Sequence, residues 1–518
     1  MSKLIYGVND SPKFSKLLLF ALQQVLAVLA ATIAVPTIIG LPVQIPAAIL
    51  GAGVGTIVYL LFTKSKSPVI ISSSFAFLGA LANAVAFGYF GILLGAIFAG
   101  LVYVIIAIIV HFVGTGWIFK LMPPAIIGPT VALIGLSLAG SAMGDIVKSA
   151  GADNASYNLV GLLCGLVTFF GVVFFTVQNK FKGARLVPFI LGILCGYTLA
   201  SIFTVIGHAT SCEYLKIVNW SSLIDNFKEI KFTSFLDYPK VGLVEGIKEL
   251  VNGEVSRDIL EAFVSNKAGS YEDFNAIYNV MDALSNDSLR LAIQEACELN
   301  NVAAPSTITW VGVAEVALAF VPVALVTFSE HVADHANLGT IIDTHLLRGE
   351  PGLTRTLLGD GVGSIVGTAF GICPNTTYGE SVGCVAITRN ASIKTIWTAA
   401  IMLIVISFIT PINCALATIP SCVMGGVCLA LYGFIAVSGL KMFKDVDLSQ
   451  NKNLFTVAAI LISGIGGLAI NIPIQVEGNQ ITKTIQITSI ATALILGIIT
   501  NTICNAIEKH NAPEADAE

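Results

Sequence analysis

Long apolar runs alternate with short polar connections along almost the whole chain. Most runs are close to the roughly 20 residues that an α-helix needs to cross the hydrocarbon core of a bilayer. The runs cover residues 17–39, 45–63, 68–86, 90–113, 123–142, 157–178, 186–207, 307–329, 357–372, 374–388, 395–413, 419–438, 453–471 and 484–505. This pattern predicts an all-α polytopic membrane protein with fourteen transmembrane segments.

The third and tenth runs differ from the others because each begins at a proline and continues through polar residues. Residues 68–75 read PVIISSSF, and residues 374–380 read PNTTYGE. Irregular backbone at bilayer depth persists only where it is buried in protein or lines a cavity. We therefore predict that segments 3 and 10 are each a short strand followed by a half-helix, and that both lie at a binding site.

The two interrupted segments occupy matching positions in the first and second groups of seven. Seven is odd, so a duplication would place the second copy inverted in the membrane, as in many secondary transporters. The sequence thus predicts two inverted seven-segment repeats. Glycine and proline are also frequent in membrane helices generally, so an unrelated pair of interruptions stays open.

Basic residues are distributed unequally between the two sides of this predicted topology. Lys64, Lys120 and Arg355 are among many that fall on one side, whereas the short loops on the other side hold only Lys148 and Lys483. Because cytoplasmic loops are enriched in Lys and Arg, we predict a multi-pass protein of the cell membrane with both termini in the cytoplasm.

Residues 209–305 form the one long polar region, which the topology places outside the cell. The region contains 8 Lys or Arg and 15 Asp or Glu, which gives a net charge of −7. Apolar residues within 271–300 recur at helical spacing, which predicts one or two amphipathic helices. Cys212 and Cys297 lie near its two ends, so either a disulfide or two free thiols is possible.

The composition indicates a membrane protein and gives little support to other classes of protein. Only 11% of the 518 residues are charged, against roughly 25% in soluble domains, and 55% are hydrophobic. The ten cysteines are scattered, without the paired spacing of a metal site. We expect no enzyme activity, no metal, no cofactor and no nucleic-acid partner; the expected partners are a small-molecule substrate, a proton and membrane lipids.

A few ionisable residues fall within or beside apolar segments, where each is a functional-site hypothesis. Glu380 lies in segment 10, and residues 330–335 read EHVADH at the end of segment 8. On a helix, Glu330 and Asp334 share one face, and His331 and His335 share another. Two such histidines could bind zinc, or the cluster could simply end the helix at the inner interface. His111 and Asp360 are interpreted as interfacial residues.

These elements together suit a particular kind of ligand. The half-helix N-termini offer unpaired N–H groups and partial positive charge, and Glu330 and Glu380 offer acceptors. A small, planar, neutral molecule with carbonyl and ring N–H groups, such as the pyrimidine uracil, matches this set. Burial favours the uncharged form of a carboxyl group, so one acid could carry a proton together with the substrate.

The tenth segment also resembles a known family. Residues 375–389 read NTTYGESVGCVAITR, which is similar to the signature of the nucleobase–ascorbate transporters, the nucleobase:cation symporters, and most like that of the bacterial uracil permeases. Shorter similarities occur elsewhere: SSFAF at 73–77, GTGW at 114–117, EH at 330–331, PGL at 351–353 and LYG at 431–433. The resemblance extends over nearly the whole chain except 209–305.

The resemblance implies an organisation into domains. A core domain would comprise residues 1–120 and 306–418, and a gate domain 121–208 and 419–505, with an acidic insertion at 209–305 and a cytoplasmic tail at 506–518. Transport would proceed by movement of the core against the gate, and the family implies a homodimer.

The resemblance also assigns roles to individual residues. Glu330 and Glu380 would hold the base, together with backbone amides of Phe75 and Gly379 and the rings of Phe75, Tyr378 and Tyr432. The residues near the two acids that would support binding or proton coupling are Asp334, His331 and Ser381.

Three positions depart from the family pattern. Ser381 stands where asparagine is usual, and Gln23-Gln24 stands where a Gln-His pair is usual. Asp334 is typical of purine-type members, whereas Glu380 is typical of uracil permeases. The sequence therefore predicts proton-coupled uracil import, with xanthine or another purine base as the alternative substrate. An anion channel or exchanger on a similar scaffold is the alternative from a different class.

Overall fold

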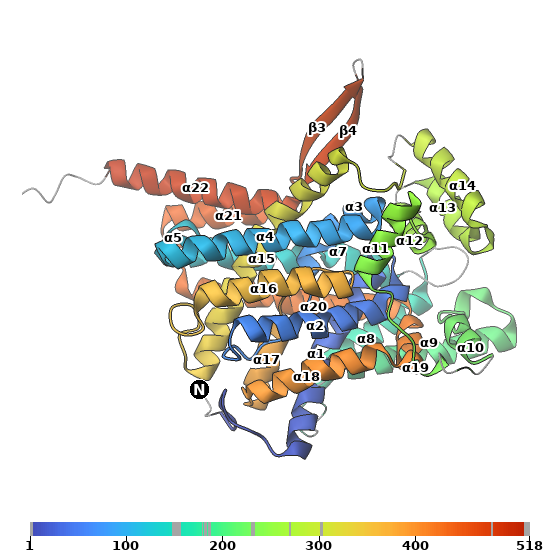
Figure 1. The fold of residues 1–518 in the computed structure, drawn as a ribbon, viewed down its shortest axis with the longest axis horizontal. Helices are drawn as coiled ribbons and strands as arrows, with labels where there is room; N and C mark the ends of the chain where they lie inside the picture. Colours follow the sequence, from blue (N-terminus) through green and yellow to red (C-terminus); the bar gives the residue numbers. More distant parts are fainter. Residues whose placement is uncertain are drawn as a thin grey trace, which may run out of the picture.

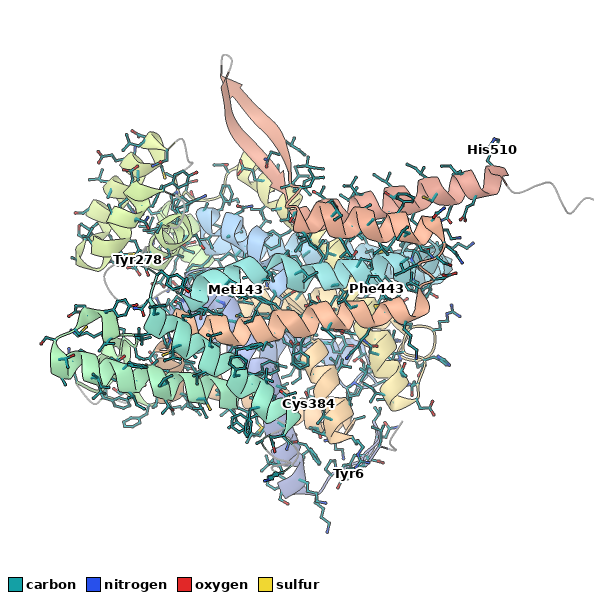
Figure 2. The ribbon with its side chains drawn as sticks, turned by 180° about the vertical axis from the view of Figure 1, so that it is seen from behind. Tyr6, Met143, Tyr278, Cys384, Phe443 and His510 are labelled. Carbon is teal, nitrogen blue, oxygen red and sulfur yellow. The ribbon has the colours of Figure 1, made fainter. Side chains whose placement is uncertain are left out.

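A computed structural model describes residues 4–147, 157–178, 180, 184, 188–228, 231, 234–268, 271–300, 304–477 and 480–511. Nine helices within these residues are long and apolar enough to cross a membrane. The long helices lie side by side, and the helices of the polar region gather at one end of the bundle (Figure 1). Seen from behind, Tyr278 of that region and His510 of the last helix lie at opposite ends of the molecule (Figure 2).

The elements follow the predicted apolar runs closely. The first half contains α1 (Phe14–Ile38), η1 (Pro42–Gln44), α2 (Ile45–Phe62), β1 (Ile71–Ser73), η2 (Phe75–Phe77), α3 (Leu78–Ala84), η3 (Val85–Phe87), α4 (Gly88–Val113), α5 (Gly116–Leu121), α6 (Pro124–Ser137), α7 (Ala139–Ile146), α8 (Leu159–Val177) and α9 (Pro188–Thr210). The second half contains α15 (Trp310–Ile342), α16 (Gly352–Phe370), β2 (Asn375–Thr377), α17 (Gly379–Thr388), α18 (Ile393–Ser407), α19 (Thr410–Ala417), α20 (Ser421–Lys441), α21 (Asn451–Ile465), β3 (Ile470–Glu477), β4 (Gln480–Ile487) and α22 (Ser489–Asn511).

Two boundaries differ from the prediction. Helix α15 does not end at residue 329 but continues to Ile342, because the polar residues at 331–335 are buried and do not mark an interface. The antiparallel hairpin β3–β4, which projects from the bundle (Figure 1), occupies the end of the predicted span 453–471 and the start of the predicted span 484–505. Alternating β-branched residues at 470–476 favour a strand at that place.

Helices from distant parts of the chain pack against one another. Helix α2 packs on α16 and α18, and α4 packs on α15 and α16, whereas α6 packs on α20 and α21 and α8 on α9 and α20. Glycines permit the closest of these contacts. A Cβ at Gly51 of α2 would lie 2.4 Å from the carbonyl oxygen of Gly367 of α16, so a side chain there would force the helices apart.

The two interrupted segments meet at the centre of the bundle as a short antiparallel pair. Strand β1 pairs with β2 in the register Ile71↔Thr377, Ser72↔Thr376 and Ser73↔Asn375. All six residues are buried, so the ladder satisfies backbone groups that lipid could not. Each strand leads directly into a short helix, as predicted for both segments.

In the part of the polar region that the structure describes, five α-helices cover one end of the bundle (Figure 1). They are α10 (Ser221–Lys228), α11 (Gly242–Asn252), α12 (Arg257–Ala268), α13 (Glu272–Val280) and α14 (Asn286–Leu299). Helices α13 and α14 confirm the amphipathic helices predicted within 271–300. Cys212 and Cys297 are both free thiols, so the disulfide alternative is wrong. Burial raises the pKa of the Cys297 thiol to about 11.

A buried acid attaches this region to the bundle. The carboxylate of Glu249 in α11 accepts hydrogen bonds from the backbone N–H groups of Tyr89 (2.8 Å) and Ser256 (2.9 Å). The amide of Tyr89 belongs to the first turn of α4, where a carboxylate is favourable because that turn has unpaired N–H groups. Asn266 of α12 adds a second attachment by donating to the carbonyl of Ile39 at 3.0 Å.

Candidate functional site

The candidate site is a small internal space between two groups of elements. One wall consists of residues 74–76, Glu330 of α15 and residues of the 376–380 stretch; the other consists of Ile134 of α6 and Ile435 of α20. The free space between the walls is about 10 Å³. That is room for about one water molecule, so a larger ligand requires the walls to separate.

The start of α17 provides hydrogen-bond donors at this space. Tyr378 is extended (φ −115°, ψ 114°), and the helix begins at Gly379 without a side-chain cap. The first N–H groups of this helix therefore lack a capping side chain, and they carry partial positive charge. Glu380 lies within the same turn, and both Gly379 and Glu380 line the space.

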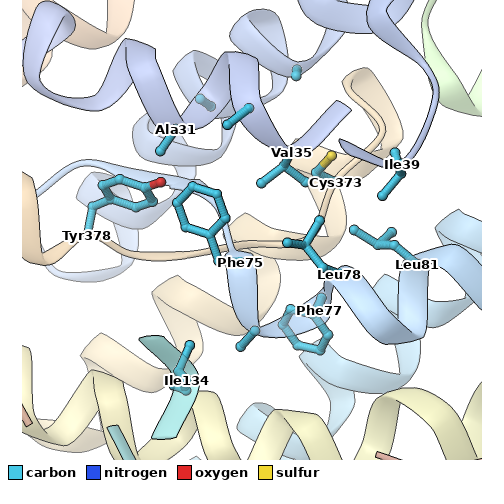
Figure 3. Close-up of a cluster of buried hydrophobic side chains, with 14 of the residues drawn as sticks. Ala31, Val35, Ile39, Phe75, Phe77, Leu78, Leu81, Ile134, Cys373 and Tyr378 are labelled. Atoms are coloured by element: carbon cyan, nitrogen blue, oxygen red, sulfur yellow. The ribbon is translucent and has the colours of Figure 1, made fainter. Parts of the chain in front are cut away.

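Aromatic rings enclose the space on another side. The rings of Phe75 and Tyr432 meet edge to face, with centroids 5.1 Å apart and planes at 89°. Phe75 and Tyr378 lie side by side, with Ala31 and Val35 of α1 beyond them and Ile134 across the space (Figure 3). The buried hydroxyl of Tyr378 has no hydrogen-bond partner within the described residues. An unpaired buried hydroxyl costs free energy, so this group is available to a ligand.

Helix α15 presents its acids and its histidines to different neighbours, as the helical spacing predicts. Glu330 lines the space. Asp334, one turn later, lies beside the start of α17: a Cβ atom built on Gly379 would be 3.4 Å from Oδ1 of Asp334. The rings of His331 and His335 stack with centroids 4.0 Å apart on the other face.

Each histidine is held by protein partners. The Nδ1 of His335 donates to the carbonyl oxygen of His331 at 2.8 Å, and its Nε2 lies 2.7 Å from the hydroxyl of Tyr59. The Nε2 of His331 is 3.0 Å from the Thr356 hydroxyl. Within the described residues there is no group of three or more His, Cys, Asp or Glu side chains arranged to hold a metal ion.

The interpretation of Asp360 as interfacial is wrong. This residue of α16 is 1% exposed, and its Oδ2 lies 2.6 Å from Nδ1 of His331. Asp360 therefore fixes the ring of a histidine that follows Glu330 directly in sequence. The same rule that identified Glu380, an acid inside an apolar run, also applies to Asp360 and would have found it.

Ser381 lies behind the space and not in its lining. Its hydroxyl donates to Oε1 of Gln24 at 2.9 Å and accepts from the backbone N–H of Ile70 at 3.1 Å. Ser381 and Gln24 are two of the positions at which this chain departs from the family pattern, and they contact each other. The serine thus connects α17 to α1 and to the residue before β1.

The structure brings together most of the predicted site residues. Glu330, Glu380, Phe75, Tyr378 and Gly379 line one space, and Tyr432 joins them through its contact with Phe75. The other three predicted residues, Asp334, His331 and Ser381, are buried beside that space. Sequence reasoning missed Ile134 and Ile435, which carry no chemical signal, and the position of Gln24.

The fold is that of a multi-pass membrane transporter. It resembles the transmembrane domain of a cyanobacterial bicarbonate transporter, BicA, with a TM-score of 0.50 at 14% identity, covering 96% of this chain and 99% of that one. It also resembles murine Solute Carrier 26 family member A9, an anion transporter in the inward-facing state, with a TM-score of 0.55 at 10% identity, covering 97% and 70%.

Sequence comparison identifies the family. The model described as "Permease family" matches residues 15–236 and 298–474. Similar curated proteins are uracil permeases: that of Bacillus caldolyticus is 30% identical, covering 97% of this chain and 95% of the relative, and that of Escherichia coli K12 is 29% identical, covering 91% and 90%. The chain therefore belongs to this permease family, the nucleobase–ascorbate transporters, as its resemblance predicted. It is a transporter and not an enzyme.

The family model leaves part of the polar region unmatched. Residues 209–236 lie within the match, and residues 237–297 lie between its two matched parts. That segment includes α11 to α14, and therefore Glu249 and its contact with α4.

Proposed function

We propose that this protein imports uracil by symport with a proton. The observation that carries the proposal is that Glu330 and Glu380, from two elements distant in sequence, line one space together with the free start of α17. The carboxylates would accept hydrogen bonds from the ring N–H groups of the base. The first-turn N–H groups near Gly379 would donate to its carbonyl oxygens.

The aromatic lining supports a planar ligand. Phe75 would stack on or abut the ring of the base, with Tyr432 supporting it from the side. The unpaired hydroxyl of Tyr378 offers a further polar contact. The similarity to several uracil permeases over nearly the full length supports uracil as the base.

Proton coupling follows from the chemistry of the two acids. Two carboxylates facing one enclosed space repel each other when both are ionised, so a proton bound between them lowers the energy of the site. Binding of a neutral base together with that proton would allow the base and the proton to cross the membrane together. Asp334, one turn from Glu330, would be a third acid within the same group.

We further propose that transport occurs by alternating access between a core and a gate. In this proposal, segments 1–4 and 8–11 form the core, segments 5–7 and 12–14 form the gate, and the two halves are inverted repeats. The walls of the site support this division, since Ile134 and Ile435 come from α6 and α20 and the remaining lining comes from predicted core elements. The small free space supports a requirement for the walls to separate.

The proposal extends to assembly and location. We place the protein in the cell membrane with both termini in the cytoplasm, because of the distribution of basic residues. A homodimer is proposed from the family alone.

Uptake into proteoliposomes tests the proposal. Labelled uracil is expected to accumulate when an inward proton gradient is imposed, and a protonophore is expected to abolish that accumulation. Unlabelled uracil should compete more strongly than xanthine. Competition by xanthine but not by uracil would overturn the pyrimidine assignment, and accumulation that follows sodium instead of protons would overturn proton coupling.

An anion substrate is the candidate that the solved relatives raise, because two of them are bicarbonate and anion transporters. The lining of the site argues against it. Within the described residues, the lining contains two glutamates and no lysine or arginine. Bicarbonate in the same competition assay is therefore expected to have no effect.

A further inference from the structure

A second and larger cavity lies away from the candidate site, where α2 and α4 end and α16 begins. Its volume is about 560 Å³, within the roughly 300–1,000 Å³ that is usual for ligand pockets. The walls are mostly apolar and include Phe62, Ile108, Phe112 and Leu358. No residue that lines the candidate site also lines this cavity.

Two basic side chains lie at this cavity. Arg355 of α16 and His111 of α4 both line it and are both exposed. Two other basic residues at this end of the bundle have partners: Lys66 pairs with Glu350, and the guanidinium of Arg348 lies 5.4 Å from the ring centre of Phe119. Arg355 forms no ion pair or side-chain hydrogen bond with any described residue. An arginine without a counter-ion beside apolar walls indicates an anionic, amphipathic ligand.

The backbone at the start of α16 also contributes positive charge to this end of the cavity. Helix α16 begins at Gly352 after Pro351, and no side chain caps its first turn. The start of the helix carries partial positive charge, which favours a phosphate. Both Gly352 and Thr354 of this turn line the cavity.

The apolar side of the cavity continues onto the exposed surface of α4. Ile105, Ile108 and Phe112 of this membrane-spanning helix are 55%, 49% and 80% exposed. In a multi-pass protein, such a surface faces acyl chains. The cavity thus opens toward lipid at one end and toward a cationic group at the other, which is the arrangement of a phospholipid.

We propose that this cavity is a binding site for one anionic phospholipid, with an acyl chain between α4 and α16 and the phosphate at Arg355. The inference does not depend on which substrate the protein transports. It assigns a role to Arg355 that is distinct from setting the orientation of the chain in the membrane. Thr356 follows Arg355 directly and contacts His331, so the lipid would hold the part of α16 that supports the candidate site.

Native mass spectrometry of the intact protein in detergent tests this site. The probes are phosphatidylglycerol and phosphatidylcholine with identical acyl chains. The wild type is expected to retain one phosphatidylglycerol in preference to phosphatidylcholine. Arg355→Gln should weaken phosphatidylglycerol binding about fivefold, since one basic residue near a membrane surface contributes about that much. Lys394→Gln, at another exposed basic residue, should leave the binding unchanged.

Two further experiments distinguish a lipid from a simple anion, and the first of them also controls for misfolding. Ile108→Trp keeps Arg355 but fills the apolar wall, and it should also lose phosphatidylglycerol while remaining monodisperse. Glycerol phosphate, the headgroup chemistry without acyl chains, should not raise the melting temperature. Equal retention of both lipids, unchanged binding in Arg355→Gln, or equal protection by glycerol phosphate would each overturn the proposal.

Discussion

The two strand–helix segments at the centre of the bundle have similar backbones and different chemistry. Residues 71–84 form β1, η2 and α3, and residues 375–388 form β2 and α17. The first contributes the ring of Phe75 and contains no charged residue. The second contributes Glu380 and the free start of α17. The comparison teaches that two segments of similar backbone can contribute an aromatic ring on one side of a space and a charge on the other.

The segments also differ in what holds their far ends. Beyond α3, the first turn of α4 is bound by Glu249 of the polar region. Beyond α17, the carbonyl of Arg389 accepts from the N–H of Ile5 at 2.8 Å, and the N–H of Ala391 donates to Tyr6 at 2.9 Å. One segment is thus anchored by the polar region and the other by the N-terminal tail. The three predictions below test this division of roles.

The largest effect is expected for Glu380→Gln, which keeps the shape of the charged segment and removes its charge. A hydrogen bond to a charged group contributes about 1.5–3 kcal/mol, so uracil should bind roughly 10- to 100-fold more weakly. Equilibrium binding of labelled uracil to the purified variant measures this. Glu295→Gln, at an exposed acid of α14, is the matched control. Unchanged affinity in Glu380→Gln would show that the charge of the second segment does not contribute to uracil binding.

An intermediate effect is expected where the two segments are joined through Ser381. Ser381→Ala and Gln24→Ala each remove one side of a buried hydrogen bond, which typically contributes about 0.5–1.5 kcal/mol. The double variant should therefore be less destabilised than the sum of the single variants. Thermal unfolding of all four proteins measures this coupling. Strictly additive losses would show that the contact contributes nothing to holding α17 against α1.

The smallest effect concerns the anchor of the first segment. Burial raises the pKa of Glu249 above its ordinary value, while the N–H groups of Ser256 and Tyr89 oppose that rise. The folded protein therefore holds this proton to higher pH than the unfolded chain does. The resulting stability is complete below the unfolded pKa and is lost as pH rises through the folded pKa.

Glu249→Gln tests this anchor because glutamine does not titrate. The melting temperature of the wild type should fall relative to that of Glu249→Gln as the pH rises from about 4.5 upward. A difference between the two proteins that is constant across this range would contradict the assignment. Glu295→Gln again serves as the control, since it should follow the wild type at every pH.

Local patterns were sufficient to predict much of this structure. Apolar runs located the membrane helices, a proline followed by polar residues located both strand–helix segments, and i,i+4 spacing separated the acids of α15 from its histidines. These features depend on residues close in sequence. The end of α15 was misplaced because polar residues at 331–335 resemble an interface until their buried partners are known.

The features that were missed depend on contacts between distant residues. Asp360 was interpreted as interfacial because its partner, His331, lies 29 residues away on another helix. The contact between Gln24 and Ser381 joins residues 357 apart. The apolar wall formed by Ile134 and Ile435 carries no chemical signal in the sequence, because any buried isoleucine looks the same before packing is known.

The pairing of β1 with β2 has a consequence for how the protein is made. The backbone N–H of Ile70 is satisfied by a hydroxyl 311 residues further along, and the three residues of β1 await partners at 375–377. A ribosome adds about 5–20 residues per second, so the first segment waits for many seconds with its hydrogen-bonding groups incomplete. The candidate site is therefore among the later parts of the molecule to be completed during synthesis.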